Sequence, residues 1–169
     1  MSQEKRSYSR IDTRLKAHAR RTSDVNSPKL FRSQSAPMAS DLRNAKLPED
    51  VVGFLQEMDR KLDTILGLLS RDQIRDDFPI DLEVIEISGA GMKFRTSESI
   101  STNDLLEVVI VLERAPLRMA GAKGSVLTHD AGSNIYGFEF QSISDNDLEA
   151  IIQFVFGRQR EQIRNARRS

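Results

Sequence analysis

Two short clusters of residues in this chain carry groups suited to binding an anionic ligand. The first contains Arg6 and Arg10, an RxxxR pair near the N-terminus. The second is the stretch EISGAG, which contains Glu86, Ser88 and Gly91. Guanidinium groups bind phosphate, or the O6 and N7 edge of guanine, in a bidentate manner. A carboxylate and a hydroxyl can hydrogen-bond a base, and a glycine lets the backbone approach a ligand closely.

The glycines of EISGAG leave three interpretations open: a phosphate loop, a hairpin turn, or one half of a split ligand site. A P-loop requires GxxxxGK and then Ser or Thr between a strand and a helix. Here the residues after Gly91 resume a strand pattern, and the Gly-rich stretch GAKGS at 121–125 does not fit either. Nucleotide hydrolysis through such a loop is therefore rejected, and the other two interpretations remain.

Catalytic and metal-binding sites have little support in the sequence. The chain has no cysteine, which excludes disulfides, thiolate metal sites and cysteine nucleophiles. His18 and His129 each stand in a strand pattern, without a carboxylate and a nucleophile arranged nearby in the sequence. We therefore expect no catalytic residue, no metal site and no cofactor, and we do not expect an enzyme.

The charge of the chain is zero overall but unevenly distributed. Residues 1–46 hold eleven Lys and Arg against four acidic residues, a net charge of +7, and residues 158–169 hold five against one, or +4. The intervening 47–157 carry nine basic and twenty acidic residues, or −11. Basic ends around an acidic body indicate an anionic ligand gathered by the terminal segments, although solvated tails without a specific partner explain the same charges. Nonspecific nucleic-acid binding by the two basic ends is a weaker interpretation of the same charges.

Length and hydropathy predict one small soluble domain. With 169 residues and 38% hydrophobic composition, the chain can build a core of about 100 residues plus appendages. Its longest apolar run, 108–112, is far shorter than the ~20 residues of a membrane span. The N-terminus has no apolar signal region, so we expect a cytoplasmic protein without a membrane span.

The elements that must position the two clusters are predicted to be mainly strands. Residues 10–20 alternate as a strand, 22–46 lack any period and are expected to be a linker, and strand patterns resume from residue 80. Alternation places Ile85 and Ile87 on one face, with Glu86 and Ser88 outward if the isoleucines enter the core. Short turns between strands suggest a small antiparallel barrel. The strands are expected at 82–87, 92–95, 105–112, 116–130 and 135–142.

Two helices are predicted around these strands. Near the C-terminus, Ser144 is the N-cap of an amphipathic helix that ends in a basic tail. The segment 47–73 has an apolar heptad seam with a 4-3 spacing. Such a seam, widened by further apolar residues, favours trimers or tetramers over dimers, although an amphipathic helix packed on its own domain is the alternative. The seam residues are Val51, Leu55, Met58, Leu62, Ile65 and Leu69.

The order of these pieces resembles the PilZ family. Arg6-x-x-x-Arg10 precedes a strand, Ser88-x-x-Gly91 lies at a turn, and YGFEF is followed by a helix running into FVFGRQRE. The resemblance covers residues 5–20 and about 80–163. It implies a small β-barrel that binds cyclic di-GMP between the arginine arm and a motif of Asp or Asn-x-Ser-x-x-Gly. Arg6 and Arg10 would then hold phosphate and guanine, with Glu86, Ser88 and Gly91 as the barrel wall.

The chain departs from the family pattern at two places: Glu86 replaces Asp or Asn, and about sixty residues, including the heptad helix, are inserted after the first strand. The resemblance implies an oligomeric, non-enzymatic cyclic di-GMP receptor that regulates motility, pili or biofilm through an unidentified downstream protein. The alternative is a degenerate adaptor that does not bind the nucleotide. The expected organisation is an arm and first strand at 1–21, a linker at 22–46, the inserted helix at 47–75, the rest of the barrel at 78–142, and a C-terminal helix and tail at 144–169.

Overall fold

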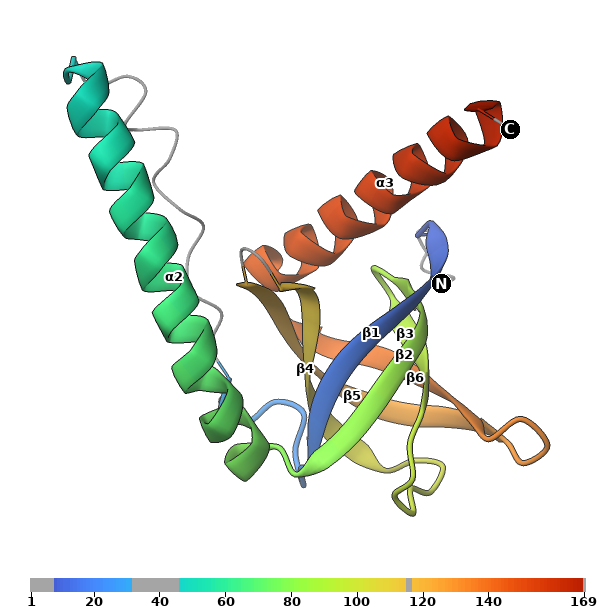
Figure 1. The fold of residues 1–169 in the computed structure, drawn as a ribbon. Coiled ribbons are helices and arrows are strands. Elements are labelled where there is room, and N and C mark those ends of the chain that lie inside the picture. The colour runs from blue at the N-terminus through green and yellow to red at the C-terminus, as the bar shows by residue number, and fades with distance from the viewer. Residues whose placement is uncertain (1–7, 32–45, 115–116, 169) are drawn as a thin grey trace, which may run out of the picture.

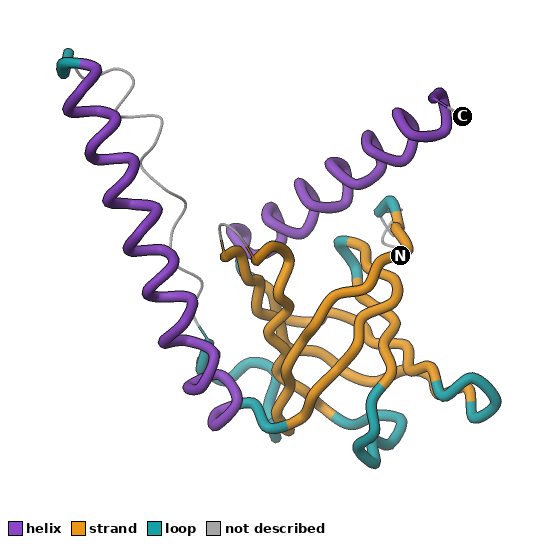
Figure 2. The backbone as a smooth tube through the Cα atoms, in the orientation of Figure 1, coloured by secondary structure: helices purple, strands orange, loops and turns teal. Residues whose placement is uncertain are grey.

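The computed structural model describes residues 8–31, 46–114 and 117–168, which form a six-stranded barrel with two long helices (Figure 1). A strand and then a helix precede the other five strands, and the second helix ends the chain (Figure 2). Neither of these helices is long and apolar enough to cross a membrane. The elements are β1 (Arg10–Arg21), α2 (Glu49–Asp77), β2 (Ile80–Ser88), β3 (Gly91–Arg95), β4 (Leu105–Arg114), β5 (Leu117–Asp130), β6 (Ile135–Ile143) and α3 (Asp145–Arg168).

The strands close into an antiparallel barrel in the order β1-β2-β3-β6-β5-β4, which confirms the predicted fold class. Closure depends on β1, because this strand pairs with β2 on one side and with β4 on the other. Inward-facing aliphatic and aromatic side chains fill the interior, and Phe94 stacks on Tyr136 with ring centroids 5.3 Å apart. The first strand thus belongs to the barrel although the long insertion separates it from the other five.

A β-bulge in β2 changes which of its residues face the core. Val84 pairs with Phe94 and Glu86 pairs with Lys93, so Ile85 is the extra residue. The alternation therefore changes phase at Ile85: Val84 is fully buried, Ile85 is only partly buried, and the next core residue is Ile87. The expected inward placement of Ile85 beside Ile87 is wrong for this reason. Glu86 does remain on the outer side, but Ser88, which was also expected to face outward, is buried.

The helix α2 has a long exposed apolar stripe. It projects away from the barrel and contacts it near its C-terminal end, on β1 and β5 (Figure 1). There Gly67 packs on Leu117, and a Cβ at Gly67 would lie 3.2 Å from the Leu117 side chain. All six seam residues, from Val51 to Leu69, are 37–67% exposed. The predicted amphipathic helix is therefore present, but its seam does not pack on its own barrel.

The first part of the predicted linker is tied to the barrel by two buried charges. Glu107 of β4 is fully buried and accepts hydrogen bonds from the Arg20 guanidinium and from the backbone N–H groups of Leu30 and Phe31, at 2.8–3.2 Å. Lys123 of β5 is also fully buried and donates to the Ser27 hydroxyl at 2.6 Å. Since a buried charge is costly unless hydrogen-bonded, these contacts fix the path of the chain on the barrel. The remainder of the linker, 32–45, lies outside the described residues.

The helix α3 packs its first turns on the barrel and leaves its basic end exposed. Ser144 Oγ accepts the backbone N–H of Asp147 at 3.2 Å and donates to its carboxylate at 2.6 Å, the predicted N-terminal cap. Ile151, Phe154 and Val155 join the barrel core. From Arg158 onward most side chains are exposed, so the basic tail faces solvent.

Candidate ligand site

The two predicted clusters meet where β1 begins and β2 ends. The antiparallel register places Arg10 opposite Ser88, although these residues are 78 positions apart in the sequence. The Arg10 guanidinium lies 3.7 Å from Oε1 of Glu86. The Arg10 side chain is 70% exposed and that of Glu86 is 24% exposed, so both groups are accessible to a ligand. Pairing of β1 with β2 thus creates a surface that carries both a cation and an acceptor.

A second cation, Lys93 of β3, completes this group of charges. Its amine lies 3.6 Å from Oε2 of Glu86, so the two carboxylate oxygens face two different cations. Lys93 reaches this position because the hairpin between β2 and β3 pairs it directly with Glu86. The register also places Asp12 opposite Glu86, so two cations face two carboxylates here, and exposed ion pairs of this kind contribute at most about 1 kcal/mol each. Such a group can exchange its partners for a bound anion at low cost.

Ser88 holds the turn of the hairpin. Its hydroxyl accepts the backbone N–H of Ala90 at 3.2 Å and lies 3.4 Å from the carbonyl oxygen of Gly91, to which it donates. The residue is only 6% exposed. Ser88 is therefore engaged inside the turn, and a ligand that used its hydroxyl would have to replace the contact with Gly91.

Gly91 is required by the packing of β3 against β6. A Cβ at this position would overlap the carbonyl oxygen of Phe138, which is backbone and cannot move aside easily. Gly91 pairs with Glu139 in the ladder that joins β3 to β6. Its lack of a side chain is thus explained by close contact between two strands, whether or not a ligand binds.

Tyr8 connects the basic arm to the turn. Its ring covers Gly89, where an added Cβ would lie 2.6–3.0 Å from three ring atoms. Tyr8 stands between the two arginines of the motif, so the chain already lies against EISGAG at Tyr8, just before β1 begins. Of the predicted site residues, Arg10, Glu86, Ser88 and Gly91 come together here, and Arg6 lies outside the described residues.

Sequence reasoning missed Tyr8 and Lys93 as members of this surface. Lys93 could have been predicted from the sequence, because a two-residue turn at Gly89 and Ala90 places Lys93 opposite Glu86. Tyr8 had a weaker signal, because an aromatic residue in an arm has no fixed neighbour until the arm docks. Neither residue belongs to the motif that suggested the site.

The described residues contain no arrangement suited to metal binding or to acid–base chemistry near this surface. No group of three or more His, Cys, Asp or Glu able to hold a metal ion occurs among them. The Nδ1 atom of His18 lies 2.9 Å from the Asp81 carboxylate, and His129 stacks on Tyr136 with centroids 4.1 Å apart. Both histidines thus have structural partners away from the turn.

The barrel and the motif residues define a PilZ domain. The family model described as PilZ domain matches residues 69–157, more than half of the chain, and the protein belongs to this family. No curated protein matches the sequence. The matched segment begins in α2 and contains β2 to β6, so β1 and the arginine arm lie outside it.

The solved structures that are similar to this chain in fold include one from Bacillus subtilis and one from Xanthomonas campestris. One is the inhibitor of motility from Bacillus subtilis, with a TM-score of 0.52 and 15% identity over 94% of this chain and 53% of that one. The chain therefore spans about half the length of the Bacillus protein. The other is a pathogenic protein from Xanthomonas campestris, with a TM-score of 0.55 and 22% identity over 94% and 90% of the two chains. That structure is described as a tetrameric PilZ domain self-assembled through an unusual helical bundle.

Proposed function

We propose that this PilZ protein is a non-enzymatic receptor for cyclic di-GMP, bound between the arginine arm and the β2–β3 hairpin. The antiparallel pairing of β1 with β2 is the observation that carries this proposal, because it brings Arg10 to Glu86 and Ser88 at one end of the barrel. Cyclic di-GMP carries two phosphates and two guanines. Arginines can bind either group in a bidentate manner, and a carboxylate can accept the N1 and N2 hydrogens of guanine.

Binding requires an exchange of partners at Glu86. In the free chain its two oxygens face Arg10 and Lys93. A phosphate that binds Arg10 and Lys93 replaces Glu86 as their ion-pair partner. The Glu86 carboxylate is then free to accept the guanine hydrogens. In this mechanism Arg6 and Arg10 bind the ligand from the arm, Glu86 binds a base, and Ser88 and Gly91 shape the wall. Lys93 adds a further phosphate contact from the barrel.

The helix α2 would assemble the receptor into a homo-oligomer, with a trimer or tetramer favoured over a dimer. Its seam is exposed along nearly the whole helix, and burial of large apolar side chains contributes about 1.5–3 kcal/mol each. Packing against copies of itself is the simplest way to bury a stripe of this width. The assembled barrels would regulate motility, pili or biofilm through a downstream protein.

A second function is favoured by the residue that departs from the family pattern. Because Glu86 already pairs with Arg10 and Lys93, these two cations have a partner without any nucleotide. The protein would then be an oligomeric adaptor that does not bind cyclic di-GMP. The two proposals share the barrel and the assembly and differ only in the ligand.

Calorimetric titration of the purified protein with cyclic di-GMP distinguishes them. The receptor predicts saturable binding that is lost or strongly weakened in Arg6→Ala and Arg10→Ala. Arg164→Ala, which removes the same charge from the exposed tail of α3, should bind like the parent. No binding at tens of micromolar, or an Arg6→Ala variant indistinguishable from the parent, would reject the receptor and leave the adaptor.

A further inference from the structure

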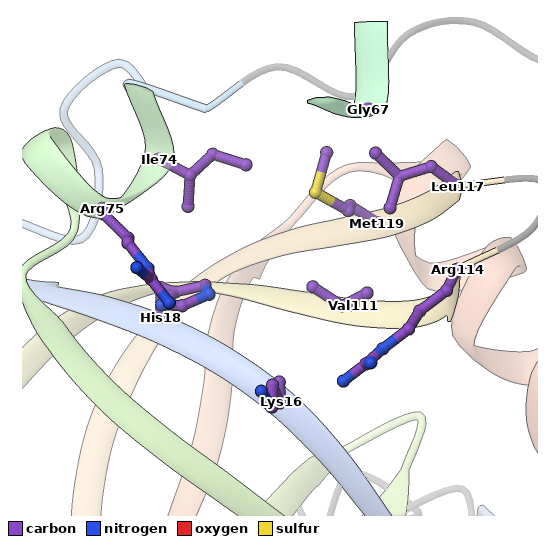
Figure 3. Close-up of a pocket in the computed structure, with 9 residues that line it drawn as sticks. All are labelled: Lys16, His18, Gly67, Ile74, Arg75, Val111, Arg114, Leu117 and Met119. Carbon is purple, nitrogen blue, oxygen red and sulfur yellow. The ribbon is translucent and has the colours of Figure 1, made fainter. Parts of the chain in front are cut away.

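A second surface with unusual charge lies at the junction between α2 and the barrel, where a cavity of about 150 Å³ opens (Figure 3). It shares no residue with the arm or with the β2–β3 turn. Four of its lining side chains are basic and come from three elements: Lys16 and His18 from β1, Arg75 from α2, and Arg114 from β4. Figure 3 shows Arg75 beside His18 and Arg114 extending toward Lys16.

These basic groups have few acidic partners. Among the residues that the structure describes, no Asp or Glu lines the cavity, although the register places Glu83 opposite Lys16. Among the described residues, Lys16, Arg75 and Arg114 form no ion pair, and His18 contacts the Asp81 carboxylate through Nδ1 only. The positive charges of Lys16, Arg75 and Arg114 repel one another, so an anion that enters the cavity is stabilised by these three cations.

The rest of the lining is apolar. Leu117 and Met119 of β5 lie below Gly67 of α2 (Figure 3), and Leu117 pairs with Arg114 across the ladder between β4 and β5. An apolar wall lowers the local dielectric constant and strengthens the attraction between a cation and a bound anion. The cavity is smaller than the ~300 Å³ at which pockets for drug-sized ligands begin, so its ligand must be small.

We propose that this cavity binds a small organic phosphate through Lys16, His18, Arg75 and Arg114, with a short apolar group of the ligand against Leu117 and Met119. A phosphate monoester carries a charge of about −1.5 to −2 near neutral pH, which suits several cations better than a single carboxylate does. Because Arg75 belongs to α2 and the other three basic residues to the barrel, the ligand bridges the two. Binding therefore fixes the helix at its base, and the site is separate from that of the nucleotide.

Titration calorimetry with phenyl phosphate as probe tests this site, at constant ionic strength and in an Arg10→Ala background that weakens the nucleotide surface. We expect saturable binding in the background protein. Adding Arg75→Gln with Arg114→Gln should weaken it about tenfold or more, since each removes a charge-assisted contact. Adding Arg164→Gln with Arg167→Gln, an equal loss of charge from the α3 tail, should leave it unchanged. Circular dichroism shows that each variant is folded.

Absence of saturable binding in the background protein, or equal weakening by both pairs of substitutions, would overturn the proposal. Inorganic phosphate serves as a second probe for the apolar wall. Phenyl phosphate should bind about tenfold more tightly or better, because burying its ring adds favourable apolar contact. Equal affinity for the two probes would contradict the role of Leu117 and Met119. The outcome is independent of cyclic di-GMP binding, since the background lacks Arg10.

Discussion

The barrel and the helix α2 both have regular apolar patterns, but they bury them in different ways. Inside the barrel, Val84, Phe94 and Ile110 are fully buried within one chain. Along α2, the seam residues from Val51 to Leu69 remain 37–67% exposed, with only the base of the helix packed on the barrel. The barrel therefore completes its core alone, whereas the helix leaves its apolar pattern exposed, as the proposed packing against other copies requires. We infer that ligand binding belongs to the single chain and assembly to several.

The largest effect is expected from a charge in the seam. Leu62→Glu should convert the oligomer to a monomer, because every copy would bury a carboxylate in the bundle at a cost of several kcal/mol per ion. Multi-angle light scattering measures the mass directly. Gln56→Glu places the same group on the other side of α2 and should leave the oligomer intact. A parent protein that is already monomeric would contradict the proposed assembly.

The barrel core should respond to a cavity without any change in assembly. Phe94→Ala removes a fully buried ring that stacks on Tyr136 and packs edge-on against Phe138. In the Leu62→Glu monomer it should lower the free energy of unfolding by about 3–5 kcal/mol, as measured by urea denaturation. In the same monomer Leu69→Ala should cost less than about 0.5 kcal/mol, because its side chain is exposed. If Phe94→Ala and Leu69→Ala lower the free energy of unfolding by similar amounts, the seam of α2 is not free of the folded core as the comparison with the barrel requires.

The turn at the candidate site should show a structural requirement of its own. Gly91→Ala places a methyl group against the Phe138 carbonyl, and we expect a loss of about 1–3 kcal/mol in unfolding free energy from overpacking. Urea denaturation of the monomer measures the loss. If Gly91→Ala is as stable as the parent, the close contact between β3 and β6 is not the reason for this glycine.

The smallest effect is expected at the cap of α3. Ser144→Ala removes the hydroxyl that accepts the Asp147 backbone N–H and should cost about 1 kcal/mol. Ser144→Asp keeps an acceptor at the cap and serves as the control, with part of the stability retained. If Ser144→Ala has the same melting temperature as the parent in thermal unfolding, this cap contributes nothing to stability.

Local patterns in the sequence were enough to predict most of the fold. Alternation identified β1 and the later strands, the heptad spacing identified α2, and Ser144 marked the start of α3. These signals depend on residues close together in the sequence, so they can be recognised without a structure. The order of the motif residues then indicated the PilZ family, whose model matches residues 69–157.

The features that were missed depend on contacts between distant segments. The bulge at Ile85 changes the phase of β2, and nothing in the alternation of its neighbours reveals it. Glu107 and Lys123 lie in strands whose sequence pattern gives no sign that these charges are buried. Both are fully buried because residues 24–31 and Arg20 surround them. Tyr8 likewise acquires its place only when the arm meets the turn. Sequence reasoning identified which residues form the candidate site better than how they are packed.

Calorimetric titration of cyclic di-GMP into the parent protein and the Leu62→Glu monomer, side by side, tests the central claim most directly. If the ligand site is complete within one chain, both proteins should bind with the same dissociation constant and the same stoichiometry per chain. Binding to the parent that disappears in a folded monomer would show that the site needs a second copy. If neither protein binds cyclic di-GMP, the receptor proposal is refuted and the oligomeric adaptor remains.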